Sequence, residues 1–462
     1  MAAHKGLPHT TDVWAGASCP GVRGGSVKKL AGTFIVIAWM VPGAAAQDIP
    51  LVLEAAVARA LKESPRVAEL RAREQGSRAA VDARRSAIKP QVSLQAGYTR
   101  TNHVDVFGIP QPDGRLRVVY PDIPDNYRTR LDVVWPLYTG GRAESLTHAA
   151  RAEAEAAGQD LAAVEAELRF DTTRAYWSAV TAAESTRVVE QALERTDAHL
   201  EDLRARLDAG LIPPNEVLTA EAQRSRQEVQ VIESRNASEL ALADLRRLTN
   251  LAPEARVRLA TPLTAPEALA ADLAAQIATA KASRPERAAL VDRIEAAAAR
   301  SAAAGSSARP SVAVAGGVDY GRPNARIFPR SDRWQDSWDV SVNASWSLWD
   351  GGRRAAETGE AAAAERALRA RLEELDSLIA LEVRQRRLDL EAGIAAARAA
   401  AHGVRSAAEA RRVVDERFAA GVATSTDMID AQVALLQAEL DRTRALASAR
   451  IAEARLARAI GQ

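Results

Sequence analysis

The residue types that carry out catalysis or bind metals are few and scattered in this 462-residue chain. Its single cysteine, Cys19, excludes a disulfide within one chain. We find no nucleophile motif and no phosphate loop, and Gly316-Gly317 lies between strand segments rather than before a helix. No two of the six histidines have metal-ligand spacing: His4, His9, His103, His148, His199 and His402. The sequence therefore predicts no catalytic residue, no cofactor site and no metal site.

Two carboxylates, Asp427 and Asp430, have a spacing that could carry a function. They lie three residues apart at the start of a predicted helix, so they share one face of that helix. Acidic residues in a first helical turn are also favoured by the helix dipole, and Thr426 or Asp427 could cap the helix. The spacing alone leaves both interpretations open, a functional pair and an ordinary helix start.

The composition indicates long helices rather than several globular cores. Long stretches consist mostly of Ala, Glu, Arg and Leu, which is typical of long helices and coiled coils. Aromatic residues make up only 4% of the chain, too few for several large cores. The 61 basic and 60 acidic residues give a formal net charge of +1, so nothing in the charge favours nucleic acid as a partner.

Two very long helices are predicted at residues 142–208 and 353–419. Neither segment contains proline, and Gly210 and Gly421 lie where each helix would stop. At ~1.5 Å per residue, each helix would be roughly 100 Å long. Shorter helices are predicted at residues 53–88, 215–249, 269–308 and 426–460. Apolar residues step by three and four, as at Leu200, Leu203 and Leu207, so coiled-coil packing is expected, and the helices alone would fit an ordinary coiled coil.

The chain contains an internal duplication. From Trp135 to Trp346, from Gly140 to Gly351 and from Gly210 to Gly421 the offset is 211 residues, and from Pro65 to Pro285 and Pro90 to Pro310 it is 220. Each copy is predicted to run helix, strand, strand, long helix, helix. We therefore divide the chain into an N-terminal extension with a cleaved signal peptide at 1–46, a first repeat at 47–250, a proline-containing linker at 251–268 and a second repeat at 269–462.

The N-terminus has the pattern of a secretory signal. Arg23, Lys28 and Lys29 form a basic region, residues 30–41 are apolar, and the small residues Ala44-Ala45-Ala46 would place Gln47 first in the mature chain. The alternative is a membrane anchor, but the apolar run is too short to span a bilayer. Residues 1–22 are unusual for a signal, and a start codon assigned too far upstream would explain them. No later segment has ~20 consecutive apolar residues, so no transmembrane helix is predicted.

Four strands are predicted, in pairs, at about residues 91–100, 127–138, 311–321 and 338–349. In the last of them Val340, Val342 and Ala344 alternate with Ser341 and Asn343. This alternation is expected of a strand with lipid on one side and water on the other. Interfacial aromatics would lie near the strand ends: Trp135, Tyr138, Trp346 and Trp349. The alternative is a small soluble sheet with these aromatics in its core.

Four strands cannot close a barrel or hide their edges in lipid, so several chains must contribute to one barrel. Three chains would give twelve strands, an even number as in bacterial outer-membrane barrels. The segments 101–126 and 322–337 are rich in Pro, Asp, Asn and Arg, as extracellular loops would be.

The mature chain resembles the TolC-like outer-membrane efflux proteins. The resemblance depends on the repeat order, on the Ala-Gly turns before Asn215 and Thr426, and on two strand-exit motifs, Trp135, Gly140, Gly141, Arg142 and Trp346, Gly351, Gly352, Arg353. It implies a mainly α protomer with a membrane β-barrel. In the family, a homotrimer forms a twelve-stranded barrel continuous with a long α-helical, coiled-coil barrel across the periplasm, whose tip contacts a periplasmic adaptor (membrane fusion) protein linked to an inner-membrane transporter.

The resemblance places the turns between the long and closing helices at that tip. The expected adaptor contacts are Gly210, Leu211, Asn215, Glu216, Gly421, Val422 and Thr426. Asp427 and Asp430 match positions where relatives carry gate carboxylates, and three copies would form a ring of six carboxylates that favours cations. Some relatives have a basic residue two positions after the turn glycine, where Ala423 and Ile212 stand here. Gln47 argues against the N-terminal lipid that some relatives carry.

The function that the resemblance implies is that of an outer-membrane channel subunit, not an enzyme. It would be the passive exit duct of a tripartite efflux pump or type I secretion system in a Gram-negative bacterium, embedded in outer-membrane lipid and gated at its periplasmic tip. The alternative is a periplasmic coiled-coil scaffold or adaptor protein with small soluble β modules.

Overall fold

A computed structural model describes residues 49–267 and 272–462. The predicted signal peptide and Gln47 lie outside the described residues. The described residues belong to one compact unit in which helices predominate. Among its described helices, none combines the length and the apolar character needed to cross a membrane.

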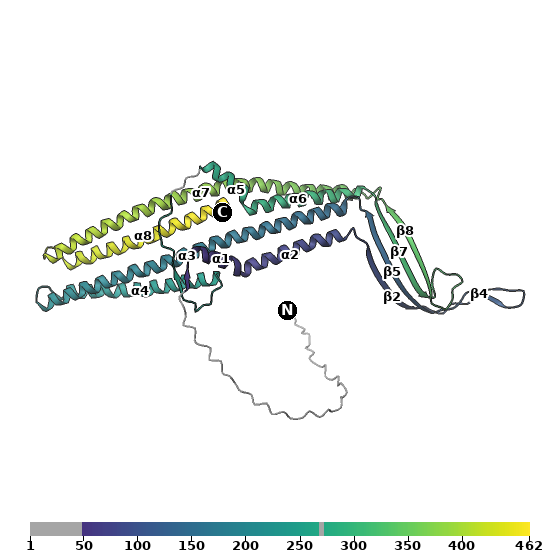
Figure 1. Ribbon diagram of the computed structural model, residues 1–462, viewed down its shortest axis with the longest axis horizontal. Helices are drawn as coiled ribbons and strands as arrows, with labels where there is room; N and C mark the ends of the chain where they lie inside the picture. The colour runs from purple at the N-terminus through teal and green to yellow at the C-terminus, as the bar shows by residue number, and fades with distance from the viewer. Residues whose placement is uncertain (1–48, 268–271) are drawn as a thin grey trace, which may run out of the picture. The chain divides into compact units, whose positions relative to one another are not determined.

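The two predicted long helices are confirmed at both ends. They are α3, Arg142–Asp208, and α7, Arg353–Ala419, with 67 residues each. Each long helix turns back at its far end into a closing helix, α4 (Pro214–Leu248) after α3 and α8 (Ser425–Ile460) after α7. The duplication thus produces two helical hairpins, which Figure 1 shows lying alongside each other.

The prediction of continuous helices at 53–88 and 269–308 is wrong, because each segment breaks before a proline. The pieces are α1 (Leu53–Glu63) and α2 (Pro65–Ser86) in the first copy, and α5 (Leu273–Ser283) and α6 (Pro285–Gly305) with a 3-10 turn at Ser306–Ala308 in the second. The residues before Pro65 and Pro285 are extended, with ψ of 124° and 122°. Proline disfavours a helical conformation in the preceding residue but is well suited to begin the next helix.

The four predicted strands form one antiparallel sheet. They are β2 (Gln91–Arg100), β5 (Asp125–Tyr138), β7 (Ser311–Arg322) and β8 (Gln335–Ser345), in the order β2-β5-β7-β8. The last strand ends at Ser345 rather than at residue 349, which leaves Trp346 and Trp349 outside it. Its partner β7 begins at Ser311, directly opposite Ser345, so no strand remains to pair beyond that point.

Two small strand pairs were not predicted. Within the segment expected to be only a loop, β3 (Phe107–Pro110) and β4 (Leu116–Tyr120) form a hairpin. Its turn, Pro112-Asp113-Gly114, with Gly114 at φ 78°, is a recognisable turn signature. Within the predicted linker, β6 (Val257–Leu259) pairs in parallel with β1 (Ile49–Leu51). Tyr176 lies beneath this pair, and its hydroxyl donates to the carbonyl of Leu51 at 2.9 Å.

The helices form a layer whose two open edges continue those of the sheet. Nearest the sheet, the neighbouring helices are α2, α3, α6 and α7 in that order, and toward the turns they are α4, α3, α8 and α7. Because α3 of the first copy packs against α6 and α8 of the second, the helices of the two copies form a single layer. One edge of the layer is formed by α2 and α4, with β2 joined to α2, and the other by α7, which follows β8 (Figure 1).

Candidate functional site

One face of the sheet is apolar across all four strands, although it is exposed in the single chain. The strand register aligns Leu94 with Leu131, Leu131 with Val318, and Val318 with Trp338. Further exposed members of the same face are Val92, Tyr98, Val133, Trp135, Tyr320, Val340 and Val342. An apolar surface this continuous marks a site that contacts lipid or another protein.

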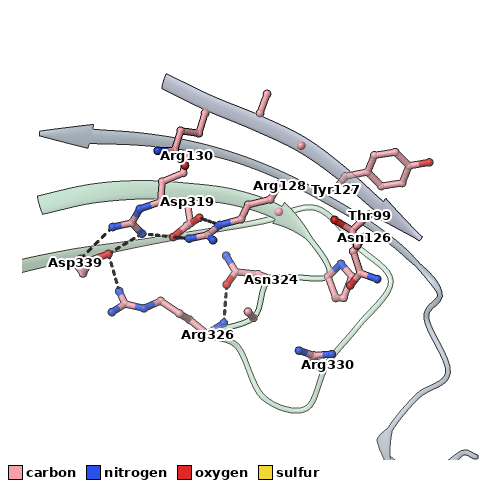
Figure 2. Close-up of a pocket in the computed structure, with 16 residues that line it drawn as sticks. Thr99, Asn126, Tyr127, Arg128, Arg130, Asp319, Asn324, Arg326, Arg330 and Asp339 are labelled. Atoms are coloured by element: carbon pink, nitrogen blue, oxygen red, sulfur yellow. Dashed lines mark hydrogen bonds and ion pairs between the residues drawn. The ribbon is translucent and has the colours of Figure 1, made fainter. Parts of the chain in front are cut away.

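The opposite face is mostly polar and carries an ion-pair network (Figure 2). Arg130 on β5 lies between carboxylates from three strands: its Nε donates to Asp132 Oδ1 at 2.6 Å, and its Nη1 is 3.0 Å from Asp339 Oδ1 and also contacts Asp319. Arg128 Nη2 donates to Asp319 Oδ2 at 3.1 Å. Val134 is an apolar exception on this face. Charged groups of this kind are expected to face water rather than lipid.

Aromatic side chains gather at both ends of the apolar face. At the end near the loops, the ring centroids of Tyr98 and Tyr127 are 5.0 Å apart, and Trp334 stacks on Tyr320 at 5.0 Å. At the end near the helices, four aromatics are exposed: Trp135, Tyr138, Trp346 and Trp349. Tyr127 and Trp135 are separated by roughly 26 Å along β5, which is the scale of a lipid-facing band between two aromatic girdles.

The sheet and the helical layer both have unpaired edges with exposed apolar residues. Strands β2 and β8 each pair on one side only. On the helices the exposed apolar residues are Leu218, Val229, Ile232 and Leu240 of α4 and Leu378, Leu381 and Leu388 of α7. The two edges are unlike, so any edge-to-edge contact between copies would be heterologous, a type of contact that closes into a ring when the rotation permits.

The strand-exit motifs build the turns from strand to long helix. Gly140, Gly141, Gly351 and Gly352 have φ between 67° and 89°, a region that disfavours side chains. A Cβ on Gly140 would lie 2.9 Å from the Ser306 carbonyl oxygen, whereas one on Gly351 would meet nothing within 4 Å. After these turns come Arg142 and Arg353, the first residues of α3 and α7, and Arg353 pairs with Glu357 at 3.2 Å.

The predicted tip turns lie at the surface and close both hairpins in the same way. Gly210 and Gly421 have φ of 70° and 76°. The amide of the next residue, Leu211 or Val422, donates to the carbonyl of Arg206 or Arg417 at 2.9 or 2.8 Å, an arrangement typical of a helix end with a left-handed glycine. Of the other predicted contact residues, Asn215 and Thr426 are exposed and Glu216 is partly buried.

The two carboxylates of the predicted gate differ in their surroundings. Asp427 forms a capping box with Thr424: its Oδ2 accepts from the Thr424 amide at 2.8 Å, and the Thr424 hydroxyl accepts from the Asp427 amide at 3.2 Å. The helix cap is therefore Thr424, and neither Thr426 nor Asp427 occupies that position. Hydrogen bonds from Thr424 lower the pKa of Asp427, so this carboxylate is charged at neutral pH. Asp430 is exposed one turn later.

The contacts that join the two hairpins at the tip could not be predicted from the sequence. A buried tip cluster draws Leu200 and Leu203 from α3, Val217 and Ala220 from α4, Phe418 from α7, and Met428 and Ile429 from α8. Ile212 and Ala423 pack against it, so the positions where relatives carry a basic residue support apolar packing here. This cluster fastens the first hairpin to the second.

Polar contacts continue this junction along α3 and α8. His199 Nε2 is 3.1 Å from Ser425 Oγ, Thr196 Oγ1 is 3.3 Å from Gln432 Oε1, and Arg195 Nη2 is 3.0 Å from Glu439 Oε2. The His199 ring also lies edge-on to Phe418, with centroids 5.2 Å apart.

The buried position of His199 predicts a pH-sensitive tip. Burial lowers its pKa, with Asp202 and Asp415 acting in the opposite direction, so the ring is neutral in the packed tip at pH 7. An unpacked His199 has an ordinary pKa near ~6.5. The packed tip should therefore be fully stable above that pH and lose stability as the pH falls from there toward the lowered pKa. The slope should be at most about 1.4 kcal/mol per pH unit for one proton.

Thermal unfolding of wild type and His199→Gln between pH 7.5 and 5 would measure this dependence. The variant should lose part of the acid destabilisation, whereas His402→Gln, at an exposed position on α7, should keep all of it. Identical pH profiles for wild type and His199→Gln would contradict the prediction.

Comparison with known proteins places this arrangement among outer-membrane channels. The model of the outer membrane efflux protein family matches residues 56–251 and 276–462. The chain is 25% identical over 406 residues to outer membrane protein TolC of Vibrio cholerae serotype O1. The alignment covers 87% of this chain and 89% of that protein.

Solved structures share the fold. The outer-membrane channel OprN aligns with a TM-score of 0.70 and 21% identity, over 88% of this chain and 89% of that one. The CmeC outer-membrane channel of Campylobacter jejuni aligns with a TM-score of 0.74 and 15% identity, over 88% of this chain and 85% of that one. The outer membrane protein VceC of Vibrio cholerae aligns with a TM-score of 0.72 and 20% identity, over 88% of this chain and 96% of that one.

Proposed function

The chain belongs to the outer membrane efflux protein family, and from that premise we propose that it is the passive exit duct of a tripartite efflux pump or type I secretion system. Its place is the outer membrane of a Gram-negative bacterium. The observation that carries the proposal is the four-stranded sheet, apolar on one face, charged on the other, and unpaired at both edges.

Three copies supply what the single sheet lacks. If β8 of one protomer pairs with β2 of the next, a homotrimer forms a closed barrel of twelve strands and no edge is left in lipid. The apolar face then contacts lipid, and the face with Arg130 and Asp319 lines a water-filled bore. The same rotation brings α7 of one protomer against α2 and α4 of the next, which covers the apolar residues on both helical edges.

The helical end carries the proposed gate and the proposed partner contacts. A periplasmic adaptor would bind the turns around Gly210 and Gly421, and an inner-membrane transporter would supply the energy. Opening would require the two hairpins to separate at the tip cluster or to rotate against neighbouring protomers. The exposure of Leu211 and Val422 at the turns supports adaptor contact there.

The alternative, a periplasmic coiled-coil scaffold, makes opposite predictions in the cell envelope. A channel should fractionate with the outer membrane, enter detergent and migrate differently on gels before and after heating. A scaffold should be released in soluble form with the periplasm and show no heat-dependent migration. The second result would overturn the proposal.

Removing the tip carboxylates should change the ion preference of the pore. In the double variant Asp427→Asn with Asp430→Asn, the asparagine at 427 keeps an oxygen acceptor for Thr424, so helix capping is preserved. Six charges leave the trimer, and the cation-to-anion permeability ratio should fall roughly twofold or more. Reversal potentials in planar bilayers under a KCl gradient measure the ratio. Asp441→Asn, an exposed residue further along α8, is the matched control, and an equal effect of both changes would remove the gate assignment.

A further inference from the structure

The polar face of the sheet holds a cavity of about 590 Å³ at the end near the loops (Figure 2). Arginines come from two directions: Arg128 and Arg130 from β5, and Arg326 and Arg330 from the connection between β7 and β8. Four guanidinium groups thus line one cavity in a single chain.

The connection between β7 and β8 is anchored over this face by specific bonds. Asn324 is only 3% exposed, and its Nδ2 donates to the Gln335 carbonyl and to Ser337 Oγ, both at 3.0 Å. Arg326 Nη1 donates to the Trp338 carbonyl at 2.6 Å and lies 3.3 Å from Asp339 Oδ1. The segment that carries Arg326 and Arg330 is therefore held against β8.

The charges in and beside the cavity do not balance. Three carboxylates, Asp132, Asp319 and Asp339, pair with the three arginines Arg128, Arg130 and Arg326.

Arg330 adds a fourth positive charge with only neutral contacts. Its Nη1 donates to the Tyr120 hydroxyl at 3.2 Å, and its guanidinium carbon lies 5.3 Å from the centroid of that ring. Within the described part of the chain, no carboxylate lies within 4.0 Å of Arg330. The cavity therefore has spare N–H donors and positive charge, while its carboxylates are already occupied by arginines.

We propose that this cavity binds an anionic group, a carboxylate, sulfonate or phosphate, on a solute that leaves through the bore, with Arg330 and Arg326 as the contacting residues. The inference depends on the proposed function, because only a closed barrel makes this face a passage. Guanidinium groups match the geometry of such anions, and their hydrogen bonds to charged acceptors are strong. A lipid phosphate is excluded as the source because lipid would contact the opposite face.

Citrate is a suitable probe, added on the loop side of single channels in planar bilayers. It should reduce the wild-type current, and Arg330→Gln should weaken this block about tenfold, as expected for the loss of one charge-assisted hydrogen bond. Within the described residues the Arg330 side chain forms one hydrogen bond, to the Tyr120 hydroxyl, and no ion pair, so its replacement should leave assembly intact.

Arg117→Gln is the matched control, since it removes one exposed arginine from β4, outside the cavity. Equal citrate block in Arg330→Gln and Arg117→Gln would overturn the inference while leaving the duct in place. A wild type that conducts no current would instead contradict the proposed function. In that case, calorimetric titration of the solubilised protein with citrate tests anion binding in the cavity separately: about tenfold weaker binding to Arg330→Gln supports an anion site there, and unchanged binding overturns it.

Discussion

Leu94→Arg should block assembly in the outer membrane, whereas Ser93→Arg, one residue earlier on the same strand, should be tolerated. Leu94 is 68% exposed on the apolar face, paired with Leu131 midway between Tyr127 and Trp135, and Ser93 points to the polar face opposite Asp132. An arginine facing lipid near the middle of the bilayer costs about 2–4 kcal/mol per chain, so a trimer would bear this cost three times. An arginine facing the bore remains in water.

The measurement is the yield of the heat-modifiable form from outer membranes of cells producing each variant at matched levels. We expect Leu94→Arg to lose most of that form and Ser93→Arg to keep it. Two variants with the same yield would mean that the two faces of the sheet do not face different solvents, and the lipid assignment would fail.

Leu203→Ala should loosen the closed tip. Leu203 is 0% exposed in the tip cluster, where it joins both hairpins. Truncating a fully buried leucine typically costs 2–5 kcal/mol, and here the lost contacts include those between the two hairpins. The expected result is a larger single-channel conductance and greater sensitivity of cells to large hydrophilic antibiotics that the outer membrane normally excludes.

Leu211→Ala is the matched control at the same tip, because Leu211 is 73% exposed and should contribute little to closure. Adaptor binding, in contrast, should be more sensitive to Leu211 than to Leu203. If Leu203→Ala leaves conductance unchanged while lowering thermal stability, the tip cluster supports the fold without controlling the passage.

The structural features that could be predicted are those determined by residues close together in the sequence. Helices α3 and α7 end at Asp208 and Ala419, each followed within two residues by a glycine that closes the turn. The alternation in β8 gave the correct faces of that strand. The breaks before Pro65 and Pro285 also have a local cause, because proline disfavours a helical conformation in the residue before it.

The remaining features depend on contacts between distant parts of the chain. The end of β8 is set by where β7 begins, and β1 pairs with a segment some 200 residues away. The contact between His199 and Ser425 joins helices from different copies. Neither residue belongs to a motif, so nothing in the sequence identified the junction that holds the tip together.

The charged cavity also depends on contacts between residues that are far apart in the sequence. Arg130 is a single residue in an alternating strand, and its partners Asp319 and Asp339 lie about 200 residues further on. The fold of the connection after β7, with Asn324 buried beneath it, determines that Arg326 and Arg330 face the same space. Periodicity can assign a strand face, but it cannot show which charges meet on it.

The most direct test of the duct is the subunit number and conductance of the mature protein, purified from outer membranes in mild detergent. We expect a particle of three chains, with both helix and strand signals in circular dichroism, that opens conducting pores in planar bilayers. A water-soluble monomer or dimer without conductance would contradict it, and the coiled-coil scaffold would then be the better explanation.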